Sequence, residues 1–279
     1  MFVTRRKFLP ATASLAAVAA ASPALGQATN ENVKWRLTSS FPKSLDTLWG
    51  ASTTIARVVG EMTEGKFTIT PFGAGEIVPG LQVLDAVQNA TVECGHSYTG
   101  YYIGKNPALV FDGSVPFGLT PRMQNAWMMF GDGRKLMDEI YDSFNVVAMP
   151  AGQTGGQMFG WFRKELKSVK DFEGLKMRTA GFGGKVMAKL GVIPQQIAGG
   201  DIYPALERGT IDACEWVGPY DDEKLGFNKV AKFYYTPGVM ELEAVNQLMI
   251  GKQAWSSLPP RYQQILRYAC AYGMMDMLA

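Results

Sequence analysis

The chain has 279 residues, of which 47% are hydrophobic and 19% charged, and a formal net charge of +2 at pH 7. This is an ordinary globular composition, with enough apolar material for one large or two small domains. Three of the 27 bases and none of the 25 acids lie in a basic leader, residues 1–26. The remaining chain is therefore near neutral, and no basic excess favours nucleic acid or anionic lipid as a partner.

Residues 1–26 have the three parts of an export signal. Basic residues at 5–7 precede a small, apolar run at 11–21, and a small-residue cleavage site follows at 24–26. The paired arginines followed by Phe8-Leu9 look like a twin-arginine signal. The apolar run is too short to span a bilayer, and no later stretch is long and apolar enough to do so. We therefore predict an exported, periplasmic protein.

Strands and helices alternate in the first part of the mature chain. The periodicity of apolar residues predicts strands at 33–38, 67–70 and 92–96, separated by helices at 48–62 and 81–87. This β-α-β-α-β order implies right-handed crossovers and a largely parallel sheet.

A polar, glycine-bearing segment at 152–156 is expected to carry the chain into a second lobe. Before it, we expect helices at 124–130 and 134–141 and a strand at 146–149. Beyond it, the pattern predicts strands at 157–162, 175–178 and 211–217, and helices at 186–190 and from 199 to 209.

Two local features concern helix ends. Asp201 is expected to cap the helix that starts at 199, with Pro204 in its first turn. The last helix opens at 257–260 and runs to Ala279, and its end at 277–279 has no glycine, cap or polar tail. Since a domain end would ordinarily supply such a stop, we expect that the chain lacks part of its C-terminus.

The cysteines and the single histidine limit the chemistry. Three widely spaced cysteines, Cys94, Cys214 and Cys270, are no disulfide framework and are expected to be buried, although one long-range pair with one left over is an alternative. His96 is the one histidine, so most histidine metal clusters and histidine-based nucleophilic sites are excluded. It lies in an apolar strand, which favours a structural role.

Arg178 ends an alternating stretch, Gly174 to Arg178, and the glycine-rich segment 181–184 leads from it into a helix. An arginine facing a helix N-terminus offers paired hydrogen bonds and backbone donors to a carboxylate. The alternative is a solvated surface arginine. Glu215 lies in an apolar strand, where a carboxylate needs a cationic partner. From the residues alone, Glu241 is best explained as a local cap or ion pair.

These stretches resemble the extracytoplasmic solute receptors of tripartite ATP-independent periplasmic (TRAP) transporters, DctP type, and among them the 2-oxo-acid-binding members. The resemblance is carried by residues 39–47, 152–163, 174–178, 194–207 and 211–226. It implies an α/β fold of two lobes, like other periplasmic binding proteins, with hinge strands and a ligand cleft between the lobes. Residues 27–152 plus about 245–279 would form lobe I, and residues 153–244 would form lobe II.

The resemblance also implies a site. Arg178 would bind the ligand carboxylate, and Tyr101 would contact the ligand. Gln157 and Trp216 would contact both the ligand and the cation. The cation would be held by Gln157, Glu215, the backbone carbonyl of Trp216 and Glu241. Such an all-oxygen set suits a hard cation, Na⁺ or alternatively Ca²⁺. A second substrate carboxylate would add uncompensated charge beside two glutamates, so small 2-oxo monocarboxylates such as pyruvate are favoured over dicarboxylates.

We therefore expect a non-enzymatic periplasmic receptor that delivers a small carboxylate to the TRAP membrane permease subunits. The alternatives are a receptor of the same fold for lactate or another carboxylate, and an exported enzyme that uses Glu215 and Glu241 as acid and base. The resemblance also implies a homodimer for some family members, whose chains continue through further helices. We also expect Arg178→Ala to abolish ligand binding without unfolding the protein, because the lost contact would belong to the ligand.

Overall fold

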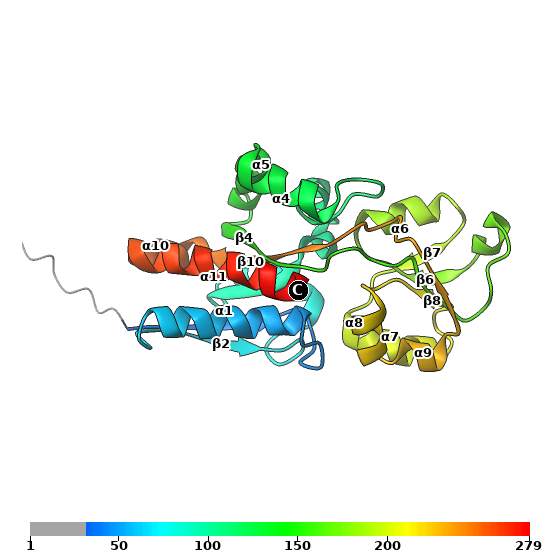
Figure 1. Ribbon diagram of the computed structural model, residues 1–279, viewed down its shortest axis with the longest axis horizontal. Coiled ribbons are helices and arrows are strands. Elements are labelled where there is room, and N and C mark those ends of the chain that lie inside the picture. The colour runs from blue at the N-terminus through cyan, green and yellow to red at the C-terminus, as the bar shows by residue number, and fades with distance from the viewer. Residues whose placement is uncertain (1–31) are drawn as a thin grey trace, which may run out of the picture. The chain divides into compact units, whose positions relative to one another are not determined.

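The structure, a computed structural model, describes residues 32–279. The predicted export signal, residues 1–26, lies outside the described residues. The described chain contains two five-stranded sheets and the helices that pack on them (Figure 1). This is the mixed α/β architecture that the alternation of strands and helices predicts.

The first sheet is partly parallel, and its strands come from both ends of the described chain. β1 pairs in parallel with both β2 and β3, as the β-α-β-α-β order requires, whereas β10 runs antiparallel to β3 and β4. In spatial order the strands are β2 (Phe67–Phe72), β1 (Val33–Ser39), β3 (Cys94–Tyr98), β10 (Val245–Gly251) and β4 (Val146–Gln153).

Helices α1 (Leu48–Met62) and α11 (Pro260–Leu278) lie side by side over this sheet (Figure 1). Burial in α1 recurs at Leu48, Ala51, Ile55 and Val59, which is the spacing of one helical face. These apolar faces and the strands enclose a core that includes Trp35, Leu37, Phe67, Leu248, Tyr262 and Leu266. Such burial is the main source of the stability of the lobe.

The remaining elements of the first lobe form its loops and its second helical layer. The α-helices are α2 (Val83–Gln88), α3 (Val110–Gly113), α4 (Pro121–Phe130), α5 (Gly133–Asp142) and α10 (Lys252–Ser257), and the 3₁₀ turns are η1 (Gly80–Gln82), η2 (Thr99–Tyr102) and η3 (Pro107–Leu109). The turn η2 follows directly on β3, so its tyrosines lie at the carboxyl end of that strand.

The second sheet is built from shorter strands. β6 pairs in parallel with β7 and β8, and β5 runs antiparallel to β8 and β9. In spatial order the strands are β7 (Ile193–Gln195), β6 (Lys176–Arg178), β8 (Ala213–Cys214), β5 (Gly160–Phe162) and β9 (Phe233–Tyr235). Its helices are α6 (Gly181–Ala188), α7 (Gly199–Glu207), α8 (Pro219–Lys224), α9 (Phe227–Val230) and the 3₁₀ turn η4 (Val169–Phe172).

Two segments connect the sheets, one between β4 and β5 and one between β9 and β10. The first contains the glycine-bearing stretch 152–156, which was predicted as a crossover. The second returns the chain to the first sheet through β10. The exact lobe boundaries, after residue 152 and before residue 245, stay a prediction.

Two strands are shorter than predicted, and the difference has a physical reason. The predicted strand at 157–162 is a strand only from Gly160, and that at 211–217 only at Ala213–Cys214. Gln157, Glu215 and Trp216 therefore lie beyond the ladder. Freed from pairing, these residues need not alternate between the two faces of a sheet.

The predicted cap of α7 is wrong. The N-cap is Ala198, without a side-chain cap hydrogen bond, so Asp201 lies in the first turn and Pro204 inside the helix. The helix starts at Gly199, where a Cβ atom would lie 2.5 Å from Cη2 of Trp216. Glycine is thus required there by the close approach of the Trp216 ring.

The cysteines and the histidine are buried as expected. Cys94, Cys214 and Cys270 are unpaired. His96 is fully buried, with its Nδ1 3.0 Å from the hydroxyl of Ser52, and burial lowers its pKa to about 3. This supports the structural role, although its Nε2 has no hydrogen-bond partner among the described residues.

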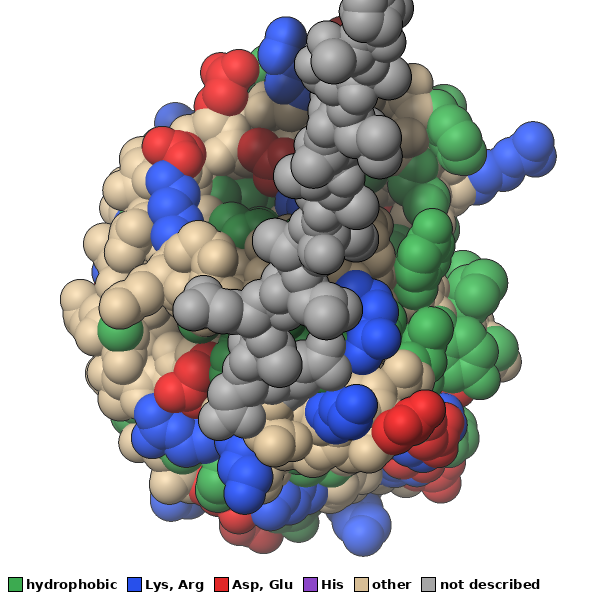
Figure 2. Space-filling view, turned by 90° about the vertical axis from the view of Figure 1, so that its left-hand side faces the viewer, with side chains coloured by type: hydrophobic (Ala, Val, Ile, Leu, Met, Phe, Trp, Pro, Cys, Tyr) green, Lys and Arg blue, Asp and Glu red, His purple; other side chains and the backbone are tan. Residues whose placement is uncertain are grey.

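Where the grey atoms leave it visible, the face shown in Figure 2 carries Lys, Arg, Asp and Glu side chains interspersed, with apolar side chains gathered toward one edge. A mixed surface of this kind agrees with the near-neutral composition. Across residues 32–279, no helix has the length and apolarity needed to cross a membrane.

A buried carboxyl in the first lobe gives a pH-dependent prediction. Asp112 accepts hydrogen bonds from the hydroxyl of Tyr141 and from Nε2 of Gln247, and burial raises its pKa to about 7 against the hydrogen bond from Tyr141. The folded state then binds this proton more tightly than the unfolded state. Its share of stability is present at acidic pH and is lost as the pH rises from the ordinary aspartate pKa of 3.8 toward 7.

We therefore expect the Asp112→Asn variant to show a shallower fall in unfolding free energy between pH of about 4.5 and about 7, by up to about 1.4 kcal/mol per pH unit. Urea denaturation at several pH values would measure it. Tyr141→Phe should extend the fall to higher pH, because the carboxylate loses a donor and the pKa of Asp112 in the folded state rises further. Equal pH slopes in wild type and Asp112→Asn would contradict the assignment.

Candidate functional site

The second sheet places Arg178 and Glu215 next to each other. β6 and β8 are parallel neighbours, with Arg178 opposite Cys214, and Glu215 is the next residue along. The backbone N–H of Glu215 donates to the carbonyl of Arg178 at 2.9 Å. Because parallel strands end at the same edge of a sheet, both side chains emerge at one carboxyl-terminal edge.

Arg178 is buried, with 2% of its surface exposed, so the surface-arginine alternative is excluded. Its Nε donates to the carbonyl of Ile197 at 3.1 Å, and its Nη1 donates to the carbonyl of Glu215 at 2.6 Å and to Oε2 of Glu215 at 3.1 Å. Nη2 takes part in none of these bonds. The guanidinium is thus fixed by the protein itself, with one nitrogen left over.

Aromatic and acidic neighbours keep this guanidinium charged. Its Cζ lies 4.8 Å from the ring centroid of Trp216, a cation–π contact. Burial alone would lower the pKa of Arg178, but Glu215, Tyr101 and Glu241 outweigh burial and raise it. Arg178 is therefore a permanent buried positive charge.

Glu241, Tyr98 at the end of β3 and Tyr101 of η2 complete the opposite side of the site. The hydroxyl of Tyr98 donates to Oε1 of Glu241 at 2.8 Å, and the ring of Tyr98 meets that of Tyr101 edge-on at 5.3 Å. Glu241 approaches Gly181, which has a φ of 61° and where a Cβ would lie 3.0 Å from Oε1 of Glu241. A residue with a side chain at 181 would be strained and crowded at once.

The two glutamates are in an unfavourable environment for ionisation. Burial first, and then repulsion from Glu241, raise the pKa of Glu215 well above its usual range, against the attraction of Arg178. Burial raises the pKa of Glu241 to about 7, opposed by the Tyr98 hydrogen bond and by Arg178. A further positive charge beside them would reverse this trend.

Three buried polar atoms of the predicted residues have no hydrogen-bond partner in the described part of the chain. They are Oε1 of Gln157, Oε1 of Glu215 and the indole Nε1 of Trp216. Buried polar groups are almost always satisfied, so such atoms call for an occupant. Two are oxygens and one is an N–H donor, which fits a hard cation together with an oxygen-bearing ligand.

A cavity of about 20 Å³ lies among these residues. Arg178, Gln157, Tyr101, Trp216 and Glu241 all line it, together with Phe41, Leu48, Tyr98, Thr154, Ala180, Ala244 and Asn246. This volume is about what a single water-sized group needs. Five of the six predicted site residues thus share one small cavity, and Glu215 joins them through Arg178.

The lining residues that sequence reasoning missed are mainly Tyr98, Thr154 and Asn246. The hydroxyl of Thr154 accepts hydrogen bonds from Nε2 of Gln157 at 3.0 Å and from the backbone N–H of Ala244 at 2.9 Å. Asn246 and the adjacent Gln247 are polar residues in the buried strand β10, which was the available signal. Tyr98 had a signal too, because it is the last residue of a parallel strand.

Side chains from the two sheets also meet at the rim of the site. The hydroxyl of Thr47 donates to Asp221, that of Tyr220 donates to Asp46 at 2.9 Å, and Lys224 pairs with Asp46. On a second edge, Nε2 of Gln196 donates to the carbonyl of Tyr101 at 2.9 Å. Polar contacts of α8 and of Gln196 thus join the second lobe to the first.

No cluster of three or more His, Cys, Asp or Glu side chains within 32–279 is arranged to hold a metal ion. The predicted set differs from such clusters because it has two glutamates, one amide and one backbone carbonyl. Its orphaned oxygens and its cavity are the reasons to retain it.

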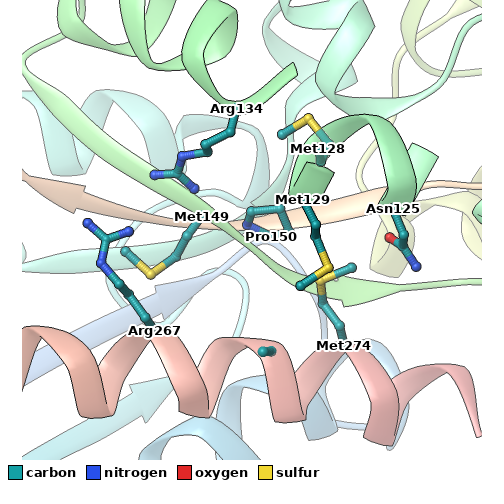
Figure 3. Close-up of a pocket in the computed structure, with 9 residues that line it drawn as sticks. Asn125, Met128, Met129, Arg134, Met149, Pro150, Arg267 and Met274 are labelled. Carbon is teal, nitrogen blue, oxygen red and sulfur yellow. The ribbon is translucent and has the colours of Figure 1, made fainter. Parts of the chain in front are cut away.

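A larger cavity, of about 170 Å³, lies in the first lobe away from the predicted residues. Figure 3 shows it bounded by α11 and by the strand that carries Met149 and Pro150, with several methionine side chains around it. It is lined by Asn125, Met128, Met129, Arg134, Met149, Pro150, Arg267, Ala271 and Met274. Without an acidic group it cannot be the predicted cation site.

The sequence matches the bacterial extracellular solute-binding protein family 7, DctP, over residues 38–276. A monocarboxylate 2-oxoacid-binding periplasmic protein of Nostoc sp. is 55% identical over 268 residues, which are 96% of this chain and 73% of the relative. The likeness therefore extends over nearly the whole chain.

Two solved structures show the same fold. A TRAP transporter solute binding protein from Bordetella bronchiseptica, with copurified calcium and picolinate in one active site, is 53% identical with a TM-score of 0.87, over 88% of this chain and 74% of that one. A TRAP periplasmic solute binding protein from Pseudoalteromonas atlantica, with bound sodium and pyruvate, is 42% identical with a TM-score of 0.85, over the same shares. The predicted resemblance and the predicted two-lobed fold are confirmed.

The contacts of Arg178 correct one expectation drawn from the sequence. Arg178 holds Glu215 and two carbonyls of its own lobe, so its loss leaves a buried carboxylate unpaired. We expect Arg178→Ala to lower the unfolding free energy by about 3–5 kcal/mol in the ligand-free protein.

Urea denaturation of two variants would check this. Arg178→Leu should be strongly destabilised, whereas Arg178→Leu combined with Glu215→Gln should regain part of the loss, because the unpaired charge is removed as well. If Arg178→Leu were as stable as the wild type, Arg178 would contribute to ligand binding and not to the stability of the ligand-free protein.

Proposed function

The chain belongs to the DctP family of bacterial extracellular solute-binding proteins, and we propose that it binds small 2-oxo monocarboxylates such as pyruvate together with a Na⁺ or Ca²⁺ ion and delivers them, in the periplasm, to the permease of a TRAP transporter. Export through a twin-arginine signal is part of this proposal. The receptor carries out no catalysis in it.

The observation that carries the proposal is the charge and hydrogen-bond state of the cavity. A permanently charged, buried Arg178 lies beside two glutamates whose pKa values are raised by burial, and beside orphaned oxygens on Gln157 and Glu215. Such an arrangement lacks one cation and one anion. A metal ion and a carboxylate ligand, bound together, supply both.

Each residue has a role in this proposal. Arg178 binds the ligand carboxylate through the guanidinium nitrogen that its own lobe leaves free. Tyr101 and the indole N–H of Trp216 contact the ligand. The cation would be held by Gln157, Glu215, Glu241 and the carbonyl of Trp216, and it would supply positive charge to the ligand oxygens. Tyr98 holds Glu241 in position.

The charge balance selects monocarboxylates. Two ionised glutamates, Arg178 and one ligand carboxylate sum to −2, so Ca²⁺ would make the closed site neutral and Na⁺ would leave it at −1. A dicarboxylate would add another buried negative charge, which is costly without a partner. Relatives bind either ion, sodium with pyruvate in one and calcium with picolinate in another.

The apolar part of the cavity wall favours a short alkyl group on the ligand. Phe41, Leu48, Ala180 and Ala244 line the cavity beside the polar groups. A 2-oxo acid offers its carboxylate and keto oxygen to one side and a short alkyl group to such walls. Lactate offers similar oxygens, so it is the competing ligand in the test.

Isothermal titration calorimetry across ligands and ions tests the proposal. We expect pyruvate and 2-oxobutyrate to bind in the presence of Na⁺ or Ca²⁺, and succinate to bind at least about a hundredfold more weakly, which corresponds to about 2.7 kcal/mol. Removal of the cation by dialysis against a chelator, in a Na⁺-free buffer, should weaken pyruvate binding.

Two outcomes would contradict the proposal. If succinate bound best, the charge argument for monocarboxylates would be wrong. If pyruvate bound equally well without either ion, the four oxygen-bearing residues would not form a cation site. Turnover of a bound oxo acid would instead favour an enzyme.

A further inference from the structure

Asp222 lies in the second lobe, outside the predicted site, and is almost fully buried. Its carboxylate accepts three hydrogen bonds: from the backbone N–H of Val217 at 3.1 Å, from Nε1 of Trp161 at 2.9 Å and from the hydroxyl of Tyr234 at 2.9 Å. None of these donors is a cation. A buried carboxylate held in this way is costly, so its position calls for an explanation.

The bond to Val217 involves a particular peptide group. The N–H of Val217 and the carbonyl of Trp216 belong to the same peptide unit, which is planar and has its N–H and C=O pointing in opposite directions. An N–H that is fixed on Asp222 therefore fixes the carbonyl of Trp216 so that it points away from Asp222. Under the proposed function, that carbonyl is a cation ligand.

The bond also changes the carbonyl electronically. A negatively charged acceptor on the N–H favours the resonance form of the peptide with more negative charge on oxygen, as in chains of hydrogen bonds that strengthen one another. A more negative carbonyl oxygen is a better ligand for a hard cation. Orientation and basicity thus act in the same direction.

The carboxylate itself is held rigidly. Oδ1 takes the Val217 bond, and Oδ2 takes both side-chain donors. The rings of Trp161 and Tyr234 stack with centroids 4.0 Å apart and an interplanar angle of 15°, so the two donors form one unit. They belong to β5 and β9, which are neighbouring strands. The sheet therefore sets the position of Asp222.

We propose that Asp222 is a positioning residue that aims and polarises the Trp216 carbonyl toward the bound cation. The inference rests on the proposed function, because it concerns the same cation site. It adds a residue that touches neither cation nor ligand and acts through a single peptide group.

Cation affinity is the first measurement. Calorimetric titration with Ca²⁺ at saturating pyruvate should show about 10- to 100-fold weaker cation binding in Asp222→Asn, the usual range for partners of metal ligands. Asp171→Asn is the control, because Asp171 likewise accepts backbone hydrogen bonds. They come from the N–H groups of Lys167 and Ser168, whose peptide units carry no proposed cation ligand. It should bind like the wild type.

A spectroscopic measurement reports on the peptide directly. Of the six tryptophans, only Trp216 is followed by valine. Labelling tryptophan with ¹³C at the carbonyl and valine with ¹⁵N therefore gives one cross-peak in an HNCO spectrum, from the Trp216–Val217 peptide. In the ligand-free protein, Asp222→Asn should shift its amide proton upfield, because a charge-assisted hydrogen bond is lost.

The outcomes separate the two proposals. If the wild type bound no 2-oxo acid with either ion, the proposed function would fail, while the amide shift would still decide whether Asp222 holds this peptide. If the wild type bound normally and Asp222→Asn bound Ca²⁺ equally well, the positioning role would be overturned. An unchanged amide proton in that variant would overturn it too.

A milder variant covers the case in which Asp222→Asn does not fold. Tyr234→Phe leaves the carboxylate charged but removes one of its two donors on Oδ2, so we expect about a two- to tenfold loss of Ca²⁺ affinity. Wild-type affinity in this variant, with Asp222→Asn unfolded, would count against the proposal.

Discussion

The buried ion pair between Arg178 and Glu215 is the interaction on which the site depends. Both side chains are about 2% exposed, and their charges meet at 3.1 Å. Removing two charges from water is costly, and the cost is offset only where further hydrogen bonds complete the geometry. Here those bonds come from the carbonyls of Ile197 and Glu215, so the pair is tied to the edge of the second sheet.

The other half of the site comes from sequence-distant segments. Tyr98 and Glu241 are 143 residues apart and meet at 2.8 Å. Glu241 precedes the return of the chain into β10, and Tyr98 ends β3, with which β10 pairs. The first sheet thus holds one carboxylate and the second sheet the other, and the same buried arginine attracts both.

Much of the fold could be predicted from local periodicity. Helix 48–62 has the predicted bounds, and the parallel order of β1, β2 and β3 follows from their crossovers. The candidate site came mainly from the resemblance, since nothing local brings Glu241 to Arg178. The hydrogen bond from Arg178 to the carbonyl of Ile197 was missed because it depends on the pairing of β6 with β7, which brings the segment after Gln195 close to Arg178. Asp201 was wrongly predicted as the cap of α7. The helix begins two residues earlier, at Gly199, where the Trp216 ring leaves no room for a side chain.

The polar contacts at the rim have a consequence for when the lobes separate. Asp46, Tyr220 and Lys224 interact through exposed groups that water replaces at little free-energy cost, because exposed pairs contribute only about 0–1 kcal/mol each. They cannot by themselves hold an empty receptor shut, and burying two glutamates without a bound cation costs further free energy. Under the proposed function, the contents of the cleft would govern the conformational equilibrium. A permease that recognises the closed form would then distinguish loaded from empty receptors without contacting the solute.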